Sequence, residues 1–99
     1  MASESDLYAP VKALLEGLGY EVKAEVKDCD VVASKAGAAP VVVELKLIFS
    51  LELVLQGIDR LKVSDSVYLA ISAPDTPTKR KNWRSRQRDI LKLCRMLGF

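Results

Sequence analysis

A charged pair interrupts the apolar stretch VVVELKL at residues 41–47. In an extended strand successive side chains alternate between faces, so Glu44 and Lys46 point to one face and the apolar residues fill the other. Burying two charges is unfavourable unless each is paired or used for chemistry. The pair is either the solvated face of an edge strand or part of a site. The apolar flanks and a central place in the expected sheet favour a site.

The chain contains no histidine, which limits the chemistry that this pair can support. Ser-His-Asp and Cys-His catalysis and histidine-ligated zinc are excluded. Any catalysis must therefore use carboxylates, lysine, hydroxyl groups or a hard metal ion.

A second carboxylate, Asp30, opens the neighbouring apolar run DVVAS. Alone it could be a turn residue. If the two runs form a hairpin about Gly37, Val32 lies opposite Val42 and Asp30 lies opposite Glu44. Opposed side chains have Cβ atoms ~4.5–5.5 Å apart, and two carboxylates that close repel unless a proton or cation lies between them. This register predicts a Mg²⁺ (or Mn²⁺) site, whereas a slip of one residue would separate the carboxylates.

Local patterns predict the element order α-β-β-β-α-β-α. The predicted helices cover residues 6–17, 50–62 and 83–97, the predicted strands cover residues 20–26, 30–34, 40–47 and 66–72, and residues 73–82 are expected to form a loop. Ser50 is expected to cap the second helix. The side chains of that helix expected to face inward are Leu51, Val54, Leu55, Ile58 and Leu61.

The fold class expected from this order is α/β, with a mixed central sheet flanked by helices in a single domain over residues 1–99. The helix between the third and fourth strands suits a crossover, which would make those strands parallel. Gly57 is expected to permit close packing on the sheet. Gly98 has the character of a helix terminator and Phe99 of the first residue of a further element, so a fragment of a longer protein stays open.

Basic residues gather in a C-terminal arm and helix over residues 79–97. The net charge is +2, but eight basic residues and one acid lie between Lys79 and Arg95, which leaves −5 for the remainder. Cations interleaved with an aromatic side chain suit phosphate contacts and stacking on an unpaired base. The alternative is a solvated face with Trp83 packed on the core. The expected partner is nucleic acid, with DNA favoured, and the residues expected to contact it on this arm are Lys79, Arg80, Lys81, Trp83, Arg84, Arg86 and Arg88.

Asp30, followed by ELK at residues 44–46 and preceded by an N-terminal helix, resembles the PD-(D/E)XK nuclease superfamily. The resemblance covers residues 4–72 and includes the order of the elements. This part of the chain is similar to archaeal Holliday-junction resolvases and to an uncharacterised bacterial family of PD-(D/E)XK-type phosphodiesterases. Cys29 stands where the motif has proline. The resemblance implies a restriction-endonuclease-like core.

The resemblance also implies roles for the residues of the motif. Asp30 and Glu44 would be metal ligands, with the backbone carbonyl of Leu45 completing the set. Lys46 would position the attacking water or stabilise charge that develops on the phosphate. The product would carry a 5′-phosphate.

Further residues match the superfamily less directly. Glu4 matches an acid on the first helix, although it also suits the helix dipole. Gln56 matches a helical glutamine that supports the site, and Arg60 could contact phosphate, but the two could equally be an exposed pair one turn apart. Glu25 is a reserve ligand.

The function expected is a magnesium-dependent nuclease or phosphodiesterase acting on nucleic acid. One alternative is a non-catalytic nucleic-acid-binding module on the same fold. Another is an interaction domain that docks its C-terminal helix on a partner or exchanges it in a homodimer. Two separated cysteines, no signal peptide and no membrane-spanning apolar run predict a cytoplasmic protein with no membrane partner.

Overall fold

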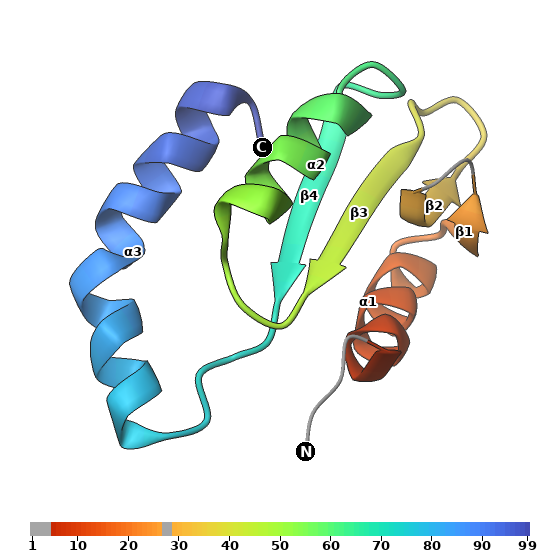
Figure 1. Cartoon of the computed structure of the whole chain (residues 1–99). Helices are drawn as coiled ribbons and strands as arrows, with labels where there is room; N and C mark the ends of the chain where they lie inside the picture. Colours follow the sequence, from red (N-terminus) through yellow and green to blue (C-terminus); the bar gives the residue numbers. More distant parts are fainter. Residues whose placement is uncertain (1–4, 27–28) are drawn as a thin grey trace.

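The computed structural model describes residues 5–26 and 29–99, which form a small α/β fold (Figure 1). The elements follow the predicted order. They are α1 (Ser5–Gly17), β1 (Glu21–Val26), β2 (Cys29–Ser34), β3 (Val41–Lys46), α2 (Leu51–Arg60), β4 (Ser66–Ile71) and α3 (Pro77–Leu97).

The strands form one mixed sheet in the order β1-β2-β3-β4. The pairs β1/β2 and β2/β3 are antiparallel, and β3 and β4 are parallel across the α2 crossover, as predicted. The predicted hairpin register is confirmed, because Val32 pairs with Val42. Gly37 has a φ of 79° in the turn, a conformation that glycine adopts without steric cost. This register carries Asp30 to the position opposite Glu44.

The two faces of the sheet are covered by different helices. The face formed by alternate residues of β3, including Val41 and Val43, packs with Leu15 of α1 in an apolar cluster. The opposite face carries Val42 and packs beneath α2. Glu44 and Lys46 belong to the α2 side because they alternate with the residues that α1 covers.

Helix α2 begins as expected, with the Ser50 hydroxyl accepting a hydrogen bond from the Leu53 N–H at 3.2 Å. Its buried residues are Leu53, Val54 and Gly57. The predicted inward-facing set is therefore wrong for the three residues Leu51, Leu55 and Ile58, which are 72%, 55% and 40% exposed. The helix is rotated so that a row of polar residues meets the polar face of β3, and this rotation turns those three outward.

Gly57 provides the close approach that was expected of it. A Cβ atom there would lie 2.6 Å from Cζ of Phe99 and 2.8 Å from Cδ2 of Leu69. The ring of Phe99 packs with the buried cluster of Val42, while the expectation that Phe99 starts a further element stays a prediction. Gly98 ends α3 in the left-handed conformation and lets the chain turn back toward α2.

Helix α3 is longer than predicted. Thr76 caps it by accepting a hydrogen bond from the Lys79 N–H at 3.1 Å, and Pro77 is the first helical residue. The predicted loop over residues 73–82 is therefore wrong from residue 77 onward. Proline at the first position is favourable because the N–H that it lacks has no partner within the helix there. Figure 1 shows α3 beyond α2, on the side of the molecule remote from α1 and β1.

Candidate functional site

Asp30 and Glu44 lie side by side on neighbouring strands, on the face of the sheet that α2 covers. Glu44 is among the most buried side chains, at 1% exposure, and Asp30 is half-buried. Oδ2 of Asp30 accepts a hydrogen bond from the Leu45 N–H at 2.8 Å. This bond holds the Asp30 carboxylate against β3, next to Glu44.

Arg60, in the last turn of α2, is the cationic partner of Glu44. Its Nε donates to Oε1 of Glu44, and the Arg60 side chain is 14% exposed. Its Nη1 also donates to Oδ2 of Asp59 at 2.8 Å. A buried carboxylate without a counter-ion would be strongly destabilising, so this ion pair explains how β3 tolerates Glu44. Arg60, which was expected to contact phosphate, thus binds the Glu44 carboxylate in this structure.

The pKa of Glu44 is raised from its ordinary value to about 7. Burial is the largest cause, because it disfavours the ionised form. The Asp30 carboxyl group, within hydrogen-bonding reach, raises the pKa further, while Arg60 opposes the shift. Glu44 is therefore easily protonated near neutral pH, and a divalent cation between it and Asp30 would favour its ionised form.

Lys46 lies two residues along β3, half-buried on the same face. Its Nζ is 3.4 Å from Oε1 of Glu52, an exposed residue in the first turn of α2. Glu52 was not among the residues expected at the site. Its spacing of four from Gln56 and of eight from Arg60 was the signal for a polar row along α2.

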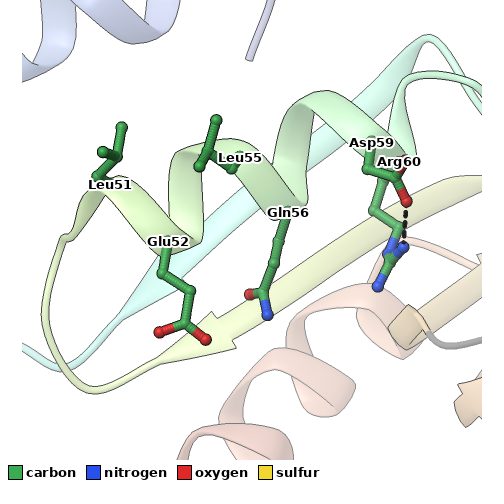
Figure 2. Close-up of a pocket in the computed structure, with 6 residues that line it drawn as sticks. All are labelled: Leu51, Glu52, Leu55, Gln56, Asp59 and Arg60. Carbon is green, nitrogen blue, oxygen red and sulfur yellow. Dashed lines mark hydrogen bonds and ion pairs between the residues drawn. The ribbon is translucent and has the colours of Figure 1, made fainter.

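Figure 2 shows the side chains of Glu52, Gln56 and Arg60 extending from one side of α2, whereas Leu51 and Leu55 point away from it. These residues border a shallow groove of about 520 Å³. Gln56 lies between the two ion pairs that Glu52 and Arg60 form with β3. Its Oε1 is buried and has no hydrogen-bond partner within residues 5–26 and 29–99. A buried amide oxygen without a donor is costly, so Gln56 is the member of this row that has an acceptor to offer.

We call the set Asp30, Glu44, Lys46, Glu52, Gln56 and Arg60 the polar seam. Its carboxylate and carbonyl oxygens are ligands of the kind that Mg²⁺ and Mn²⁺ prefer. Within the described ranges, no group of three or more histidine, cysteine, aspartate or glutamate residues is placed to hold a metal ion. Two carboxylates with a backbone carbonyl and waters are nevertheless sufficient for Mg²⁺. The donor set therefore fits such an ion, provided that Glu44 exchanges Arg60 for it.

Two acidic residues expected at the site are not among the side chains that the structure describes. Glu4 lies outside the described residues. The side chain of Glu25 is also outside what the structure describes, although its backbone belongs to β1.

Apart from Arg60, the basic residues expected to contact nucleic acid do not join the polar seam. They lie on α3, where the lysines and arginines are exposed and Trp83 is half-buried. Lys79 is 3.3 Å from the Asp75 carboxylate, an exposed pair that contributes little stability. The structure thus separates a polar seam centred on the buried Glu44 from an exposed cationic helix.

Compared with protein-family models, curated proteins and solved structures, the chain matches none of them. In the described part of the chain, no helix has both the length and the apolar content required to cross a bilayer.

Proposed function

We propose that this protein is a metal-dependent nuclease or phosphodiesterase that hydrolyses nucleic-acid phosphodiester bonds on a restriction-endonuclease-like fold of the PD-(D/E)XK type. The observation that carries the proposal is that Asp30 lies beside Glu44 on the adjacent strand, held by the Leu45 N–H, with Lys46 two residues further on the same face. The αβββαβ order and the parallel β3/β4 pair are compatible with that fold.

In the proposed site Asp30, Glu44 and the carbonyl oxygen of Leu45 hold Mg²⁺ or Mn²⁺. When bound, such an ion polarises a phosphoryl oxygen and lowers the pKa of a coordinated water. Lys46 exchanges Glu52 for a phosphoryl oxygen or the attacking water, since the exposed Glu52 carboxylate is a weak competitor. The water oxygen bonds to phosphorus, the bond to the 3′-oxygen breaks, and that oxygen takes up a proton.

Two further side chains of α2 are proposed to assist. The buried Oε1 of Gln56 accepts a hydrogen bond from water in the site. Arg60, displaced from Glu44, turns its guanidinium to the phosphate, where it can donate two parallel hydrogen bonds. The exposed cations of α3 hold the rest of the polyanion.

The test is cleavage of labelled single-stranded and duplex DNA and RNA in Mn²⁺, by wild type and by Asp30→Asn and Lys46→Met. Each variant is expected to lose about 100-fold or more in rate, as when a group that stabilises transition-state charge is removed. Glu16→Gln and Lys12→Met are matched controls, because they make the same changes of charge on α1, away from the seam. Wild-type rates in a folded Lys46→Met protein would contradict the proposal.

One observation favours a non-catalytic nucleic-acid-binding module instead. Arg60 already supplies Glu44 with a counter-ion, so the fold does not require a metal there. Titration calorimetry with Mn²⁺ separates the two. Saturable binding that Glu44→Gln removes supports the nuclease. No Mn²⁺ binding, together with nucleic-acid affinity that EDTA leaves unchanged, supports the module.

A further inference from the structure

A second groove, of about 570 Å³, lies between α3 and the ends of β3 and β4. Leu47 and Ser72, the residues that directly follow these two strands, both line it and are joined by a hydrogen bond from the Ser72 N–H to the Leu47 carbonyl at 3.3 Å. Ligands of open α/β sheets commonly bind outside the carboxyl ends of parallel strands. The volume is within the range of about 300–1,000 Å³ that is typical of ligand sites.

The walls of this groove differ in chemistry. The sheet side is mostly apolar and includes Ile48, Phe49 and Ile71, and the loop before α3 adds Asp75, the ion-pair partner of Lys79. The helix side carries polar and aromatic side chains of α3 with the spacing of one helix face. These residues are Lys79, Asn82, Trp83, Arg86 and Ile90.

Each of these groups matches part of a nucleotide. Trp83 and Phe49 are half-buried aromatic rings, on whose faces a base can stack. Asn82 has both donors and an acceptor for the edge of a base. Lys79 and Arg86 are exposed at the groove, where a phosphate would lie.

The charge beyond the groove indicates a polymer as the occupant. Arg80, Arg84 and Arg88 follow one another at intervals of four residues on α3, do not line the groove, and are exposed. A row of cations that continues past a site for one nucleotide suits the phosphates of the neighbouring nucleotides.

We propose that this groove holds an unpaired base of a single-stranded nucleic acid, stacked on Trp83, with Arg86 on the adjoining phosphate. A base within a duplex could enter only by leaving its stack and its pair, which costs a few kcal/mol. The substrate class is therefore single-stranded DNA or RNA, or duplexes with unpaired ends or gaps. This inference rests on the proposed function where it connects binding with cleavage. Leu47 lines the groove and directly follows Lys46, so a strand bound in the groove lies next to the Lys46 end of the polar seam.

The test uses the fluorescence of Trp83, which is the only tryptophan in the chain. The protein is titrated in EDTA at low salt with a short oligothymidylate, with a blunt-ended hairpin duplex, and with thymidine monophosphate. Single strand is expected to quench Trp83 saturably and to bind about tenfold more tightly than duplex, the equivalent of stacking one base.

Arg86→Ala and Arg84→Ala form a matched pair, because both remove one exposed arginine from α3 but only Arg86 lines the groove. Arg86→Ala is expected to weaken single-strand binding about tenfold, as loss of a charged hydrogen bond to phosphate does, and Arg84→Ala no more than about threefold. Trp83→Leu, followed by anisotropy of a labelled strand, is expected to remove the preference for single strand. Circular dichroism verifies that each variant is folded.

Equal affinity for duplex and single strand, or equal losses in Arg86→Ala and Arg84→Ala, would overturn the proposal and leave a cationic surface only. Binding of the monophosphate as tight as that of the oligonucleotide would also overturn it, in favour of a site for small nucleotides. The two proposals fail separately. Quenching in EDTA without cleavage in Mn²⁺ removes the nuclease and keeps the groove, whereas cleavage without strand preference does the reverse.

Discussion

The polar seam and the α3 groove carry the charged residues of this protein in opposite ways. In the seam, Glu44 is buried and forms an ion pair with Arg60, whose side chain is 14% exposed. On α3 the cations are exposed, and Asp75, the acidic partner of Lys79, is itself exposed. A buried charge must have its counter-ion within the fold, whereas an exposed charge is solvated by water and stays accessible to a charged ligand. The seam is thus suited to chemistry on a positioned group, and the groove to recognition.

Removal of the counter-ion from the seam is expected to have the largest effect on stability. Arg60→Leu leaves Glu44 buried without a cation, which is expected to lower the free energy of unfolding by about 3–5 kcal/mol at pH 8. At pH 5.5 the loss should be smaller, because Glu44 with a pKa of about 7 is already protonated there. Urea unfolding at both pH values measures this, with Arg84→Leu as the exposed control. Equal losses at the two pH values would contradict the role given to the Glu44 charge.

The raised pKa of Glu44 predicts a specific dependence of stability on pH. Its pKa is about 4.5 in the unfolded chain and about 7 in the folded one, so between these values the folded state binds more protons. The Glu44 contribution to the free energy of unfolding therefore falls as pH rises from about 4.5 to about 7, by at most about 3 kcal/mol, and is constant above. Glu44→Gln should remove this fall in denaturation curves. If Glu44→Gln kept the wild-type dependence of the free energy of unfolding on pH, titratable groups other than Glu44 would be its cause.

The junction between α2 and the end of α3 can be tested through Gly57. Gly57→Ala places a methyl group against Phe99 and Leu69 and is expected to destabilise the fold by about 1–3 kcal/mol. Gly17→Ala is the matched control, since nothing lies within 4 Å of its added methyl group, and it is expected to be neutral or stabilising by up to about 1 kcal/mol. Thermal unfolding measures both. Phe99→Ala combined with Gly57→Ala should recover part of the loss if the collision with that ring is its cause.

The smallest effect on stability is expected on α3. Arg84→Ala and Arg88→Ala should change the free energy of unfolding by no more than about 0.5 kcal/mol, because both side chains are exposed. Each should nevertheless reduce by about one the slope of log affinity for nucleic acid against log salt concentration. Binding titrations at several salt concentrations measure the slope. An unchanged slope would exclude these arginines from phosphate contacts.

Local patterns predicted the elements well where each signal was strong. The structure confirms the predicted alternation in β3 and the turn at Gly37, which together set the register that brings Asp30 beside Glu44. It also confirms the predicted Ser50 cap of α2. The predicted loop over residues 73–82 rested on their Pro, Asp and Asn content, although Thr76 followed by Pro77 is also a signal for the start of a helix.

The inward face of α2 was missed for a different reason. Leu51, Leu55 and Ile58 form as regular an apolar row as the buried Leu53, Val54 and Gly57, so periodicity alone does not decide between them. The rotation of the helix depends on which of its rows meets β3. Because the buried Glu44 needs a cationic partner, the row of α2 that contains Arg60 faces β3.

The amino-acid sequence by itself determined the strands, the hairpin and hence the meeting of two carboxylates, because these depend on alternation and on a turn of a few residues. Only the tertiary structure decided that Arg60 neutralises Glu44, that Glu52 meets Lys46, and that Trp83 faces a groove. These contacts join residues on separate elements, and they follow from how α2 is rotated and where α3 lies. Such placements are set by packing over the whole core, which no local pattern contains.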